Sequence, residues 1–453
     1  MADGKEAAAR ALFSKAIKLG ELGRTEDEIA AYDELIATIG NASDVTLREG
    51  VALALVNKAA ALGLLGRCEH EIAVCNDVVA RFGAASELPL REGVARALLN
   101  KAAALCDLGR SEDEITAYDD LVARFETALE LPLRERVARA LVNKGSALGD
   151  LDRYEDALVA YDDLIARFDN ASELPLRELL ANALVNKGGA LSQLGREDEA
   201  TATCEELIIR FRAAPEPALR EYVARALFNK GVGLGELGSR EDEIAVYDNL
   251  VARFGNSSKL RLREEVAQAL YNKGIAFHHL GRSEDEIAAY DDLGARFGGA
   301  SEPFVREMVA KALFNKACTL GRLGRSNDEI ATYDDLIGRF GDAPERPVRE
   351  QVTMALFNKG YRFGLLGRND EEIAVYDELV SRFGAASELP VREQVATALF
   401  NKGYTLDRLG RSEEAAAAYD EVIARFGAAE ESALREVVGR AQYEQRLTQD
   451  RSG

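Results

Sequence analysis

Apolar residues recur along the chain at spacings of three, four and seven, inside a block of 43 residues that repeats from one end to the other. In the third block, Val94, Leu98, Leu105 and Leu108 lie at these spacings around Lys101. Such spacings place the side chains on one face of an α-helix. The pattern therefore predicts, in every block, a first helix of about 20 residues that is buried along this stripe.

Local signals predict where the first helix of the third block begins and ends. Ser86 is a suitable N-cap, and Pro89 fits the first helical turn. The Leu-Gly-Arg stretch that follows the apolar stripe contains Gly109, which is expected to terminate the helix.

A second, shorter helix is predicted to follow at once. We expect Ser111 and Glu114 to form a capping box, in which Ser111 accepts the Glu114 amide proton and the Glu114 side chain reaches back. Phe125 is expected to fill the joint between neighbouring blocks. The apolar stripe of this helix consists of Ile115, Tyr118, Leu121, Val122 and Phe125. Each block is therefore predicted to be a helical hairpin that buries its stripes by stacking on the next hairpin.

Ten lysines mark the phase of the repeat, each 43 residues after the one before: Lys15, Lys58, Lys101, Lys144, Lys187, Lys230, Lys273, Lys316, Lys359 and Lys402. This periodicity predicts an all-α fold, an elongated α-solenoid of ten hairpins over residues 1–430. A polar capping helix is expected at 431–449, where Gln442, Glu444 and Gln445 replace the repeated Leu, Asn and Lys. Residues 450–453 are expected to be a disordered tail.

The repeat resembles the tetratricopeptide repeat. Within residues 139–161, Leu141 lies at the large apolar position of that family, Gly145 at the small one, and Tyr154, Ala157 and Tyr161 at the next three. The long unit is similar to a variant found in kinesin light chains and some bacterial regulators. The resemblance covers about residues 5–427, and it implies a right-handed superhelix whose first helices line the concave side.

An asparagine precedes nine of the ten lysines and forms the asparagine row: Asn57, Asn100, Asn143, Asn186, Asn229, Asn272, Asn315, Asn358 and Asn401. Asparagine is a middling helix former, so its repeated presence inside a helix needs a reason. In similar proteins, such as O-linked N-acetylglucosamine transferases and chaperone co-factors, an asparagine here holds the backbone of a bound extended peptide. The alternative is a structural bond to a carbonyl of the neighbouring repeat, copied by duplication.

The lysines lie on the core stripe, so their stems are expected to be packed. We interpret them as structural partners of Asp119 and Asp120 of the following helix and of their equivalents.

Two sets of positions vary between repeats and are candidates for partner binding. Five residues before the lysine, basic residues suggest a locally basic groove for an acidic peptide, or else a solvated surface: Arg96, Arg139, Arg225 and Lys311. Aromatic residues close to the lysine suggest either core packing or anchors for apolar side chains: Phe228, Tyr271, Phe314, Phe357, Phe400, Tyr361 and Tyr404.

Composition restricts the function further. The net charge of −21 disfavours nucleic acid, because binding phosphates requires basic residues. No run of 18 apolar residues occurs, and the first residues lack the apolar core of a signal peptide, so no membrane association is expected. The five cysteines are odd in number and scattered, which is typical of reduced thiols, and a cytoplasmic location is expected.

No cofactor or metal site is expected. Adjacent His278 and His279 diverge by about 100° on a helix, and in the group of Cys68, His70 and Cys75 the last replaces a core tyrosine. The chain lacks a phosphate-binding loop, a nucleophile elbow and a Ser/His/Asp set. The sequence therefore favours a non-enzymatic scaffold that binds an extended peptide of a partner. The alternatives are an end-to-end self-assembling protein and a sensor subunit of a larger signalling system.

Overall fold

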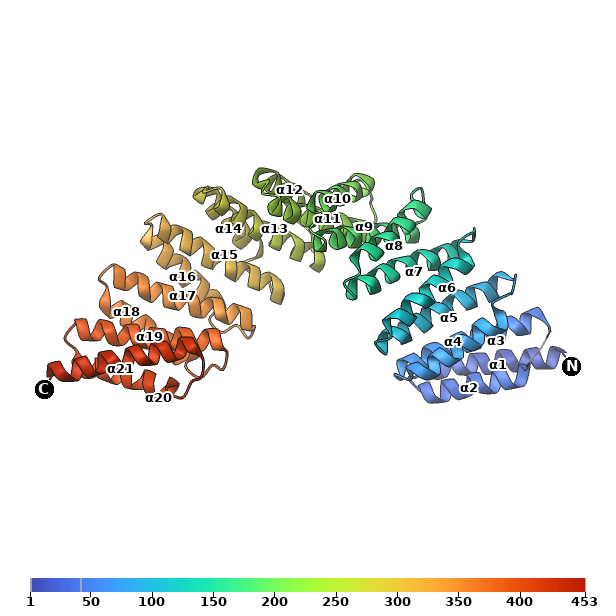
Figure 1. Ribbon diagram of the computed structural model, residues 1–453, viewed down its shortest axis with the longest axis horizontal. Helices are drawn as coiled ribbons and strands as arrows, with labels where there is room; N and C mark the ends of the chain where they lie inside the picture. The colour runs from blue at the N-terminus through green and yellow to red at the C-terminus, as the bar shows by residue number, and fades with distance from the viewer. Residues whose placement is uncertain (1, 41–42, 453) are drawn as a thin grey trace. The chain divides into compact units, whose positions relative to one another are not determined.

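The computed structural model describes residues 2–40 and 43–452, and within these ranges every regular element is an α-helix. The chain divides into two compact units, Met1–Leu237 and Gly238–Gly453, each of which is described by itself (Figure 1). The first unit consists of α1 (Ala2–Glu21), α2 (Thr25–Ile39), α3 (Val45–Leu64), α4 (Cys68–Phe82), α5 (Leu88–Asp107), α6 (Ser111–Phe125), α7 (Leu131–Asp150), α8 (Tyr154–Phe168), α9 (Leu174–Gln193), α10 (Glu197–Phe211) and α11 (Pro217–Glu236).

The second unit continues the same alternation of long and short helices. It consists of α12 (Arg240–Phe254), α13 (Leu260–His279), α14 (Ser283–Phe297), α15 (Pro303–Arg322), α16 (Ser326–Phe340), α17 (Arg346–Leu365), α18 (Asn369–Phe383), α19 (Leu389–Arg408), α20 (Ser412–Phe426) and α21 (Ser432–Ser452). The odd-numbered helices are the predicted first helices, and the even-numbered ones are the second helices. The all-α solenoid fold is therefore confirmed.

The turn inside nearly every described hairpin is made by the predicted glycine, and in the hairpin of α7 and α8 it is made by Asp152, with φ of 58°. Gly109 adopts a left-handed conformation with φ of 67°, which a residue with a side chain rarely accepts. The amide of Arg110 then donates to the Leu105 carbonyl at 2.9 Å and closes the end of α5. This confirms the predicted end of the first helix.

Both predicted serine caps are wrong by one residue. The N-cap of α5 is Glu87 rather than Ser86, and its carboxylate accepts the Ser86 amide proton at 3.0 Å. The N-cap of α6 is Arg110, with no side-chain cap, so Ser111 and Glu114 do not form a capping box. The left-handed glycine turns the chain early enough that Ser111 is already the first helical residue.

Neighbouring hairpins are joined by an arginine that serves two contacts. Arg91 binds Glu130, the N-cap of α7, at 2.6 Å, and its guanidinium carbon lies 5.9 Å from the centre of the Phe125 ring. Phe125 is buried, as expected for a side chain that fills the joint. Ion pairs of the same kind recur at Arg48–Glu87, Arg134–Glu173, Arg177–Glu216, Arg263–Glu302, Arg306–Glu345, Arg349–Glu388 and Arg392–Glu431.

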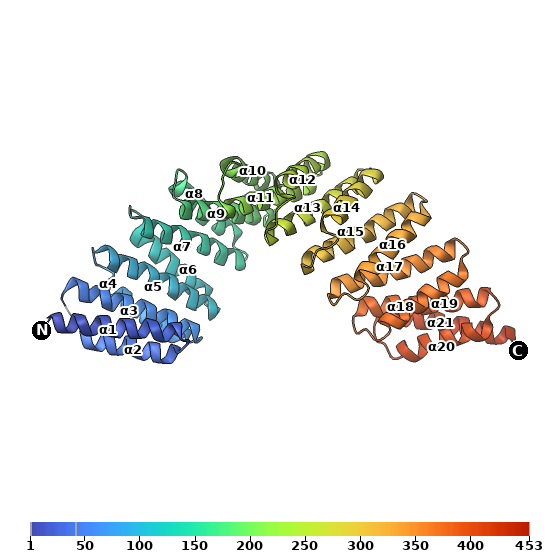
Figure 2. The ribbon, with the colours of Figure 1, turned by 180° about the vertical axis from the view of Figure 1, so that it is seen from behind.

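In each unit the first helices form one layer and the second helices another. Successive first helices contact each other, from α1 to α11 and from α13 to α21 (Figure 2). Among the described residues, second helices contact only first helices. The first-helix layer is therefore the more closely spaced one, so each unit curves with the first helices on its inner face.

The last helix closes the second unit as expected for a cap. Leu434, Val438 and Ala441 are buried against α19 and α20. Gln445 takes the place of the repeated lysine and donates to Asp420. The helix continues to Ser452, through residues predicted to be disordered, and Gly453 lies outside the described residues. In the described part of the chain, no helix combines the length and the apolar character needed to span a bilayer.

Candidate functional site

The lysine row is structural, as interpreted from the sequence. Lys144 pairs with Asp119 at 2.5 Å and Lys187 with Asp162 at 2.6 Å, and the lysine side chains are mostly buried. The partner lies on the preceding hairpin, not on the following helix as predicted, and Asp120 instead pairs with Arg124. The same pair recurs at Lys58–Asp33, Lys230–Glu205, Lys273–Asp248, Lys316–Asp291, Lys359–Asp334 and Lys402–Asp377.

All nine members of the asparagine row are half-buried on the first helices. In several hairpins the asparagine amide donates to a tyrosine hydroxyl of the preceding second helix, as between Asn57 and Tyr32 and between Asn272 and Tyr247, both at 3.3 Å. Asn358 donates to Tyr333 at 3.4 Å in the same way. The structural role therefore uses a tyrosine hydroxyl rather than the expected backbone carbonyl. Burial raises the pKa of Tyr247, so that the hydroxyl stays protonated.

The asparagine oxygen is not needed for these bonds. In the first unit, Asn57 Oδ1 accepts a hydrogen bond of 3.2 Å from Arg96 Nη2, which lies one hairpin further along. The amide nitrogen thus holds the Asn57 side chain in place, while its oxygen is directed toward the next first helix, α5. Asn100 and Asn229 differ, because Cys75 and Cys204 stand where the tyrosine is elsewhere.

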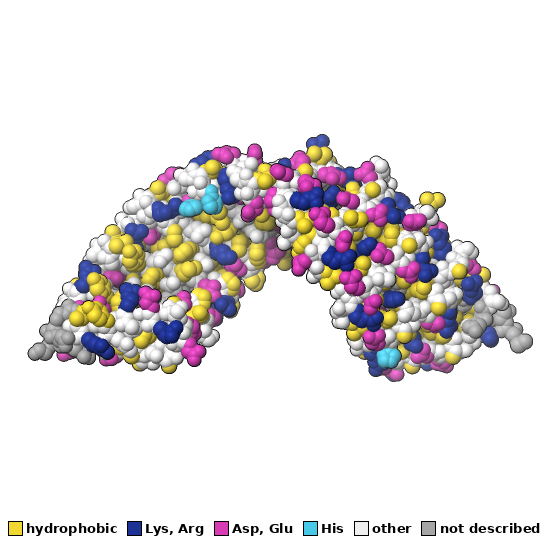
Figure 3. All heavy atoms as spheres, viewed as in Figure 1, with side chains coloured by type: hydrophobic (Ala, Val, Ile, Leu, Met, Phe, Trp, Pro, Cys, Tyr) yellow, Lys and Arg dark blue, Asp and Glu magenta, His cyan; other side chains and the backbone are white. Residues whose placement is uncertain are grey.

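The predicted basic residues lie on the inner layer beside acidic ones. Arg96 and Lys311 are half-buried and Arg139 and Arg225 are exposed. Lys311 pairs with Glu307 one turn before it, at 2.6 Å. A glutamate occupies that place throughout, at Glu6, Glu49, Glu92, Glu135, Glu178, Glu221, Glu264, Glu307, Glu350, Glu393 and Glu436. Figure 3 shows charges of both signs mixed over the visible surface of each unit.

One arginine of the inner layer was missed by the sequence analysis. Arg136 lies on α7, and its Nε is buried without a hydrogen-bond partner among the described residues. Burial lowers its pKa, and the neighbouring Arg96 and Arg139 lower it further. Three arginines therefore gather on α5 and α7, against Glu92 and Glu135.

The aromatic residues two places before the lysine pack within their own hairpins. Ring centres lie 6.1 Å apart for Tyr271 and Tyr290 and 5.9 Å apart for Phe400 and Tyr419. Phe314 and Phe357 pack on the tyrosines of their hairpins in the same way, and Phe228 is half-buried on α11. Core packing therefore accounts for most of this row.

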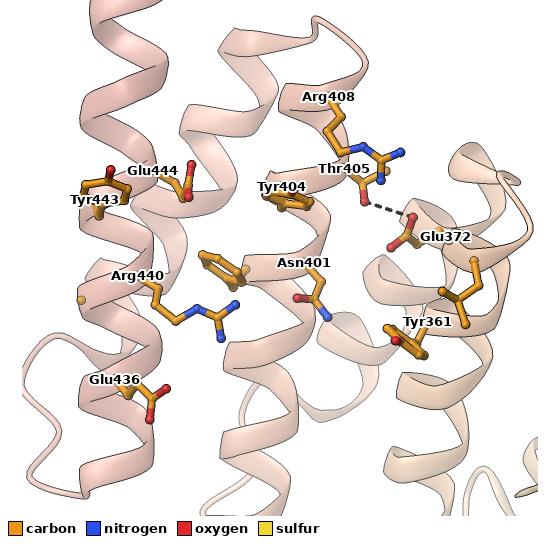
Figure 4. A pocket seen from close by; sticks show the side chains of 14 residues that line it. Tyr361, Glu372, Asn401, Tyr404, Thr405, Arg408, Glu436, Arg440, Tyr443 and Glu444 are labelled. Carbon is orange, nitrogen blue, oxygen red and sulfur yellow. Dashed lines mark hydrogen bonds between the residues drawn. The ribbon is translucent and has the colours of Figure 1, made fainter.

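Tyr361 and Tyr404, two places after the lysine, are different: they are 53% and 48% exposed. Both line a cavity of about 750 Å³ in the second unit, between α17, α19 and α21 (Figure 4). Phe400 and Asn401 also line it, so the structure brings four of the predicted residues together. The remaining lining residues are Gly364, Leu365, Glu372, Thr405, Arg408, Glu436, Gly439, Arg440, Tyr443 and Glu444.

Two important lining residues on α21 were missed, although the repeat could have revealed them. Tyr443 follows Phe400 by 43 residues, and Arg440 follows Thr397 by the same interval. Tyr443 is 63% exposed. The guanidinium of Arg440 lies 4.3 Å from the centre of the Phe400 ring. Continuing the row into the capping helix would have identified both.

Buried glutamates form a further row that the sequence analysis misassigned. Glu372 is 6% exposed and accepts a 3.0 Å hydrogen bond from Thr405 Oγ1. Burial raises its pKa, while Thr405 and Arg408 lower it. The equivalent Glu114, expected in a capping box, is likewise buried, and burial raises its pKa. Each carboxylate occupies space beside the first helix of its own hairpin, as Glu372 does beside Gly364.

Family models described as tetratricopeptide repeat match residues 142–217, 236–300 and 396–425. These matched segments are tetratricopeptide repeats. Among solved structures, the crystal structure of the apo form of RapI aligns with 12% sequence identity over 88% of this chain and 99% of that chain, with a TM-score of 0.48. A search of curated proteins finds no match.

The part of the chain that the structure describes contains no metal-binding group of three or more His, Cys, Asp or Glu side chains. The His278 and His279 rings lie 5.9 Å apart, and His278 contacts Glu286 and Arg322. Cys68 and Cys75 are buried free thiols. Tetratricopeptide repeats support a role in protein–protein interaction, and the features that distinguish this array are the arginine group of the first unit and the aromatic cavity of the second.

Proposed function

We propose that this protein is a non-enzymatic interaction scaffold that binds an extended segment of a partner protein along its first-helix layer. The observation that carries the proposal is the cavity of the second unit. Tyr361, Leu365, Tyr404 and Tyr443 are each about half exposed or more around it. Contiguous exposed apolar side chains around a concave site are typical of a binding surface.

The asparagine row supplies contacts that do not depend on the partner's side chains. Its amide nitrogens are already bound to tyrosine hydroxyls in several hairpins, which fixes the side chains before a ligand arrives. The oxygens are then oriented to accept backbone N–H groups of an extended peptide. This would let one site tolerate different sequences.

Acidic residues of the partner would be bound in the first unit. Arg96, Arg136 and Arg139 outnumber Glu92 and Glu135 there, and guanidinium groups form strong paired hydrogen bonds with carboxylates. Arg225 on α11 extends the basic positions within this unit. The charge would mainly guide the orientation and the rate of association.

The test is selection from a random peptide library on the purified chain, followed by fluorescence anisotropy with the recovered peptides. We expect the double variant Tyr361→Ala/Tyr404→Ala to weaken peptide binding about tenfold or more. Truncating a central aromatic anchor costs about 2 kcal/mol or more of binding free energy in typical interfaces. Ile209→Ala, an exposed apolar residue on second helix α10, is the matched control and should change nothing.

A second variant tests the asparagines together. Asn143, Asn186, Asn229 and Asn272 are replaced by Ala, and circular dichroism verifies the fold. Unchanged peptide affinity in this folded variant would remove the asparagine row from the binding site. If no peptide is recovered by the unmodified chain, the scaffold proposal itself is wrong.

A further inference from the structure

We propose that the cavity of the second unit binds an arginine side chain of the partner segment, held by stacking on exposed tyrosine rings and by the carboxylates of the lining. This inference rests on the proposed scaffold function and names the chemistry of its main anchor. It assigns to the second unit a cationic ligand group, opposite in sign to the acidic groups proposed for the first.

The aromatic faces are the first line of support. Tyr361, Tyr404 and Tyr443 come from three successive first helices, α17, α19 and α21, and all three line the same cavity (Figure 4). The face of an aromatic ring attracts a cation, and a guanidinium stacks on it particularly well. Tyr361, Tyr404 and Tyr443 are 53%, 48% and 63% exposed, so each offers ring surface to a ligand.

The cavity already contains one such interaction within the chain. Arg440 projects from α21 into the lining, with its guanidinium carbon 4.3 Å from the centre of the Phe400 ring. This contact shows that the space between α19 and α21 accommodates a stacked guanidinium. A partner's arginine would occupy the neighbouring tyrosine faces in the same manner.

The charges of the lining favour a cation over an anion. Three carboxylates, Glu372, Glu436 and Glu444, face two guanidinium groups, Arg408 and Arg440. Arg440 lies one helical turn from both Glu436 and Glu444, and Arg408 lies close enough to Glu372 to lower its pKa. Both arginines therefore have acidic neighbours, and one carboxylate remains in excess for a ligand. An acidic ligand would instead be repelled by this excess.

One lining position on α21 carries no side chain that could occupy the cavity. Gly439 stands where the other first helices carry Ala or Thr, as at Ala396 and Thr353. A Cβ built on Gly439 would meet no atom within 4 Å, so it would project into open space. Gly439→Leu therefore offers a way to fill the cavity without disturbing the packing.

The test is fluorine NMR of the full chain labelled with 3-fluorotyrosine, in which single Tyr→Phe variants assign Tyr361, Tyr404 and Tyr443. The probes are N-acetyl methylamides of arginine, of citrulline, which has the same shape without the charge, of leucine and of glutamate. We expect the arginine probe to shift all three signals and to bind about fivefold tighter than citrulline.

Three variants should each weaken the arginine probe selectively. Tyr443→Leu removes a ring but keeps apolar bulk, Glu436→Gln/Glu444→Gln removes the excess charge, and Gly439→Leu fills the space. The charge variant should leave citrulline binding unchanged. Ile209→Ala in the first unit is the control and should affect none of the probes.

Equal binding of arginine and citrulline, tighter binding of leucine or glutamate, or no response to any probe would each overturn the proposal. These results differ from a failure of the scaffold function. If selected peptides still bind through Tyr361 and Tyr404 while arginine shows no preference, only the cationic anchor is wrong. If no peptide is selected at all, the scaffold function fails whatever the probes show.

Discussion

The two units are built from one repeat, yet their inner layers differ at corresponding positions. Two residues before the lysine, the first unit carries the aliphatic Leu99, Val142 and Val185, between the aromatic Phe13 of its first repeat and Phe228 of its last. The second unit is aromatic throughout, at Tyr271, Phe314, Phe357, Phe400 and Tyr443. The three grouped arginines occur in the first unit and the aromatic cavity in the second. The comparison teaches that the helical framework of the repeat stays constant while selected side chains of the first helices, both packed and exposed, differ between the units.

The buried glutamates show the same contrast inside the joints. In the second unit Glu329 pairs with Arg362 at 2.5 Å, and Glu372 accepts a hydrogen bond from Thr405. The corresponding residue after Glu71 is Ala104, and Asp107 nearby raises the pKa of Glu71 further. In these joints of the second unit the buried glutamate is held by a cation or a hydrogen-bond donor. In the equivalent joint of the first unit it lies near another carboxylate.

The largest expected effect comes from removing a cation from a joint of the second unit. Arg362→Ala leaves Glu329 buried and without its ion-pair partner, and breaking a buried pair in this way costs about 3 kcal/mol. Urea unfolding should show this loss. Ala104→Gly, at the matching position of the first unit, removes no charge partner and should cost about 1 kcal/mol through helix propensity and about 0.8 kcal/mol through the lost buried methyl group.

The double variant Glu329→Gln/Arg362→Leu separates the charge from the packing. It removes both ions, so it should recover most of the loss caused by Arg362→Ala. Equal destabilisation by the single and the double variants would mean that the arginine acts through its bulk and not through its charge.

The constant features of the repeat were predictable from sequence because they follow helical geometry. The apolar spacing, the left-handed Gly109 and the pairing of Lys144 with an aspartate are all local or strictly periodic. The direction of that pairing was not predictable, since a period says nothing about which neighbouring hairpin a side chain meets. Glu114 was misassigned for a related reason: the same Ser-x-x-Glu pattern fits a cap or a buried carboxylate, and only the position of the turn decides.

The site was predictable in part. Tyr361, Phe400, Asn401 and Tyr404 were chosen from their offsets, and the cavity brings them together. The part of the lining on α21 was missed because the capping helix departs from the repeat at its core positions. This departure hides the fact that Tyr443 continues the aromatic positions two residues before the lysine.

An intermediate effect is expected from pH in the first unit. Burial and the nearby Asp107 raise the pKa of Glu71 to about 7. A carboxyl whose pKa is raised on folding stabilises the fold below its ordinary value near 4.5 and loses that contribution as the pH rises through 7. Between pH 5 and pH 8 the free energy of unfolding should fall by about 2 kcal/mol on this account.

Urea unfolding at several pH values measures this slope, and Glu71→Gln should flatten it. Glu372→Gln in the second unit is the comparison. Thr405 and Arg408 oppose the rise in the pKa of Glu372, so its contribution to the slope should be smaller. An unchanged slope in Glu71→Gln would show that other carboxyls carry the pH dependence.

The smallest expected effect concerns the asparagine row, where the two units offer a matched pair. Asn272→Ala in the second unit removes the hydrogen bond to Tyr247 and should cost about 1 kcal/mol, the usual net value of such a bond. In the first unit, Cys204 stands in place of the tyrosine near Asn229, so Asn229→Ala should lower the free energy of unfolding clearly less. Urea unfolding of both variants gives the difference. If the two costs are the same, the tyrosine hydroxyl does not stabilise the joint, and the constancy of asparagine at these positions must come from what it binds on the inner layer.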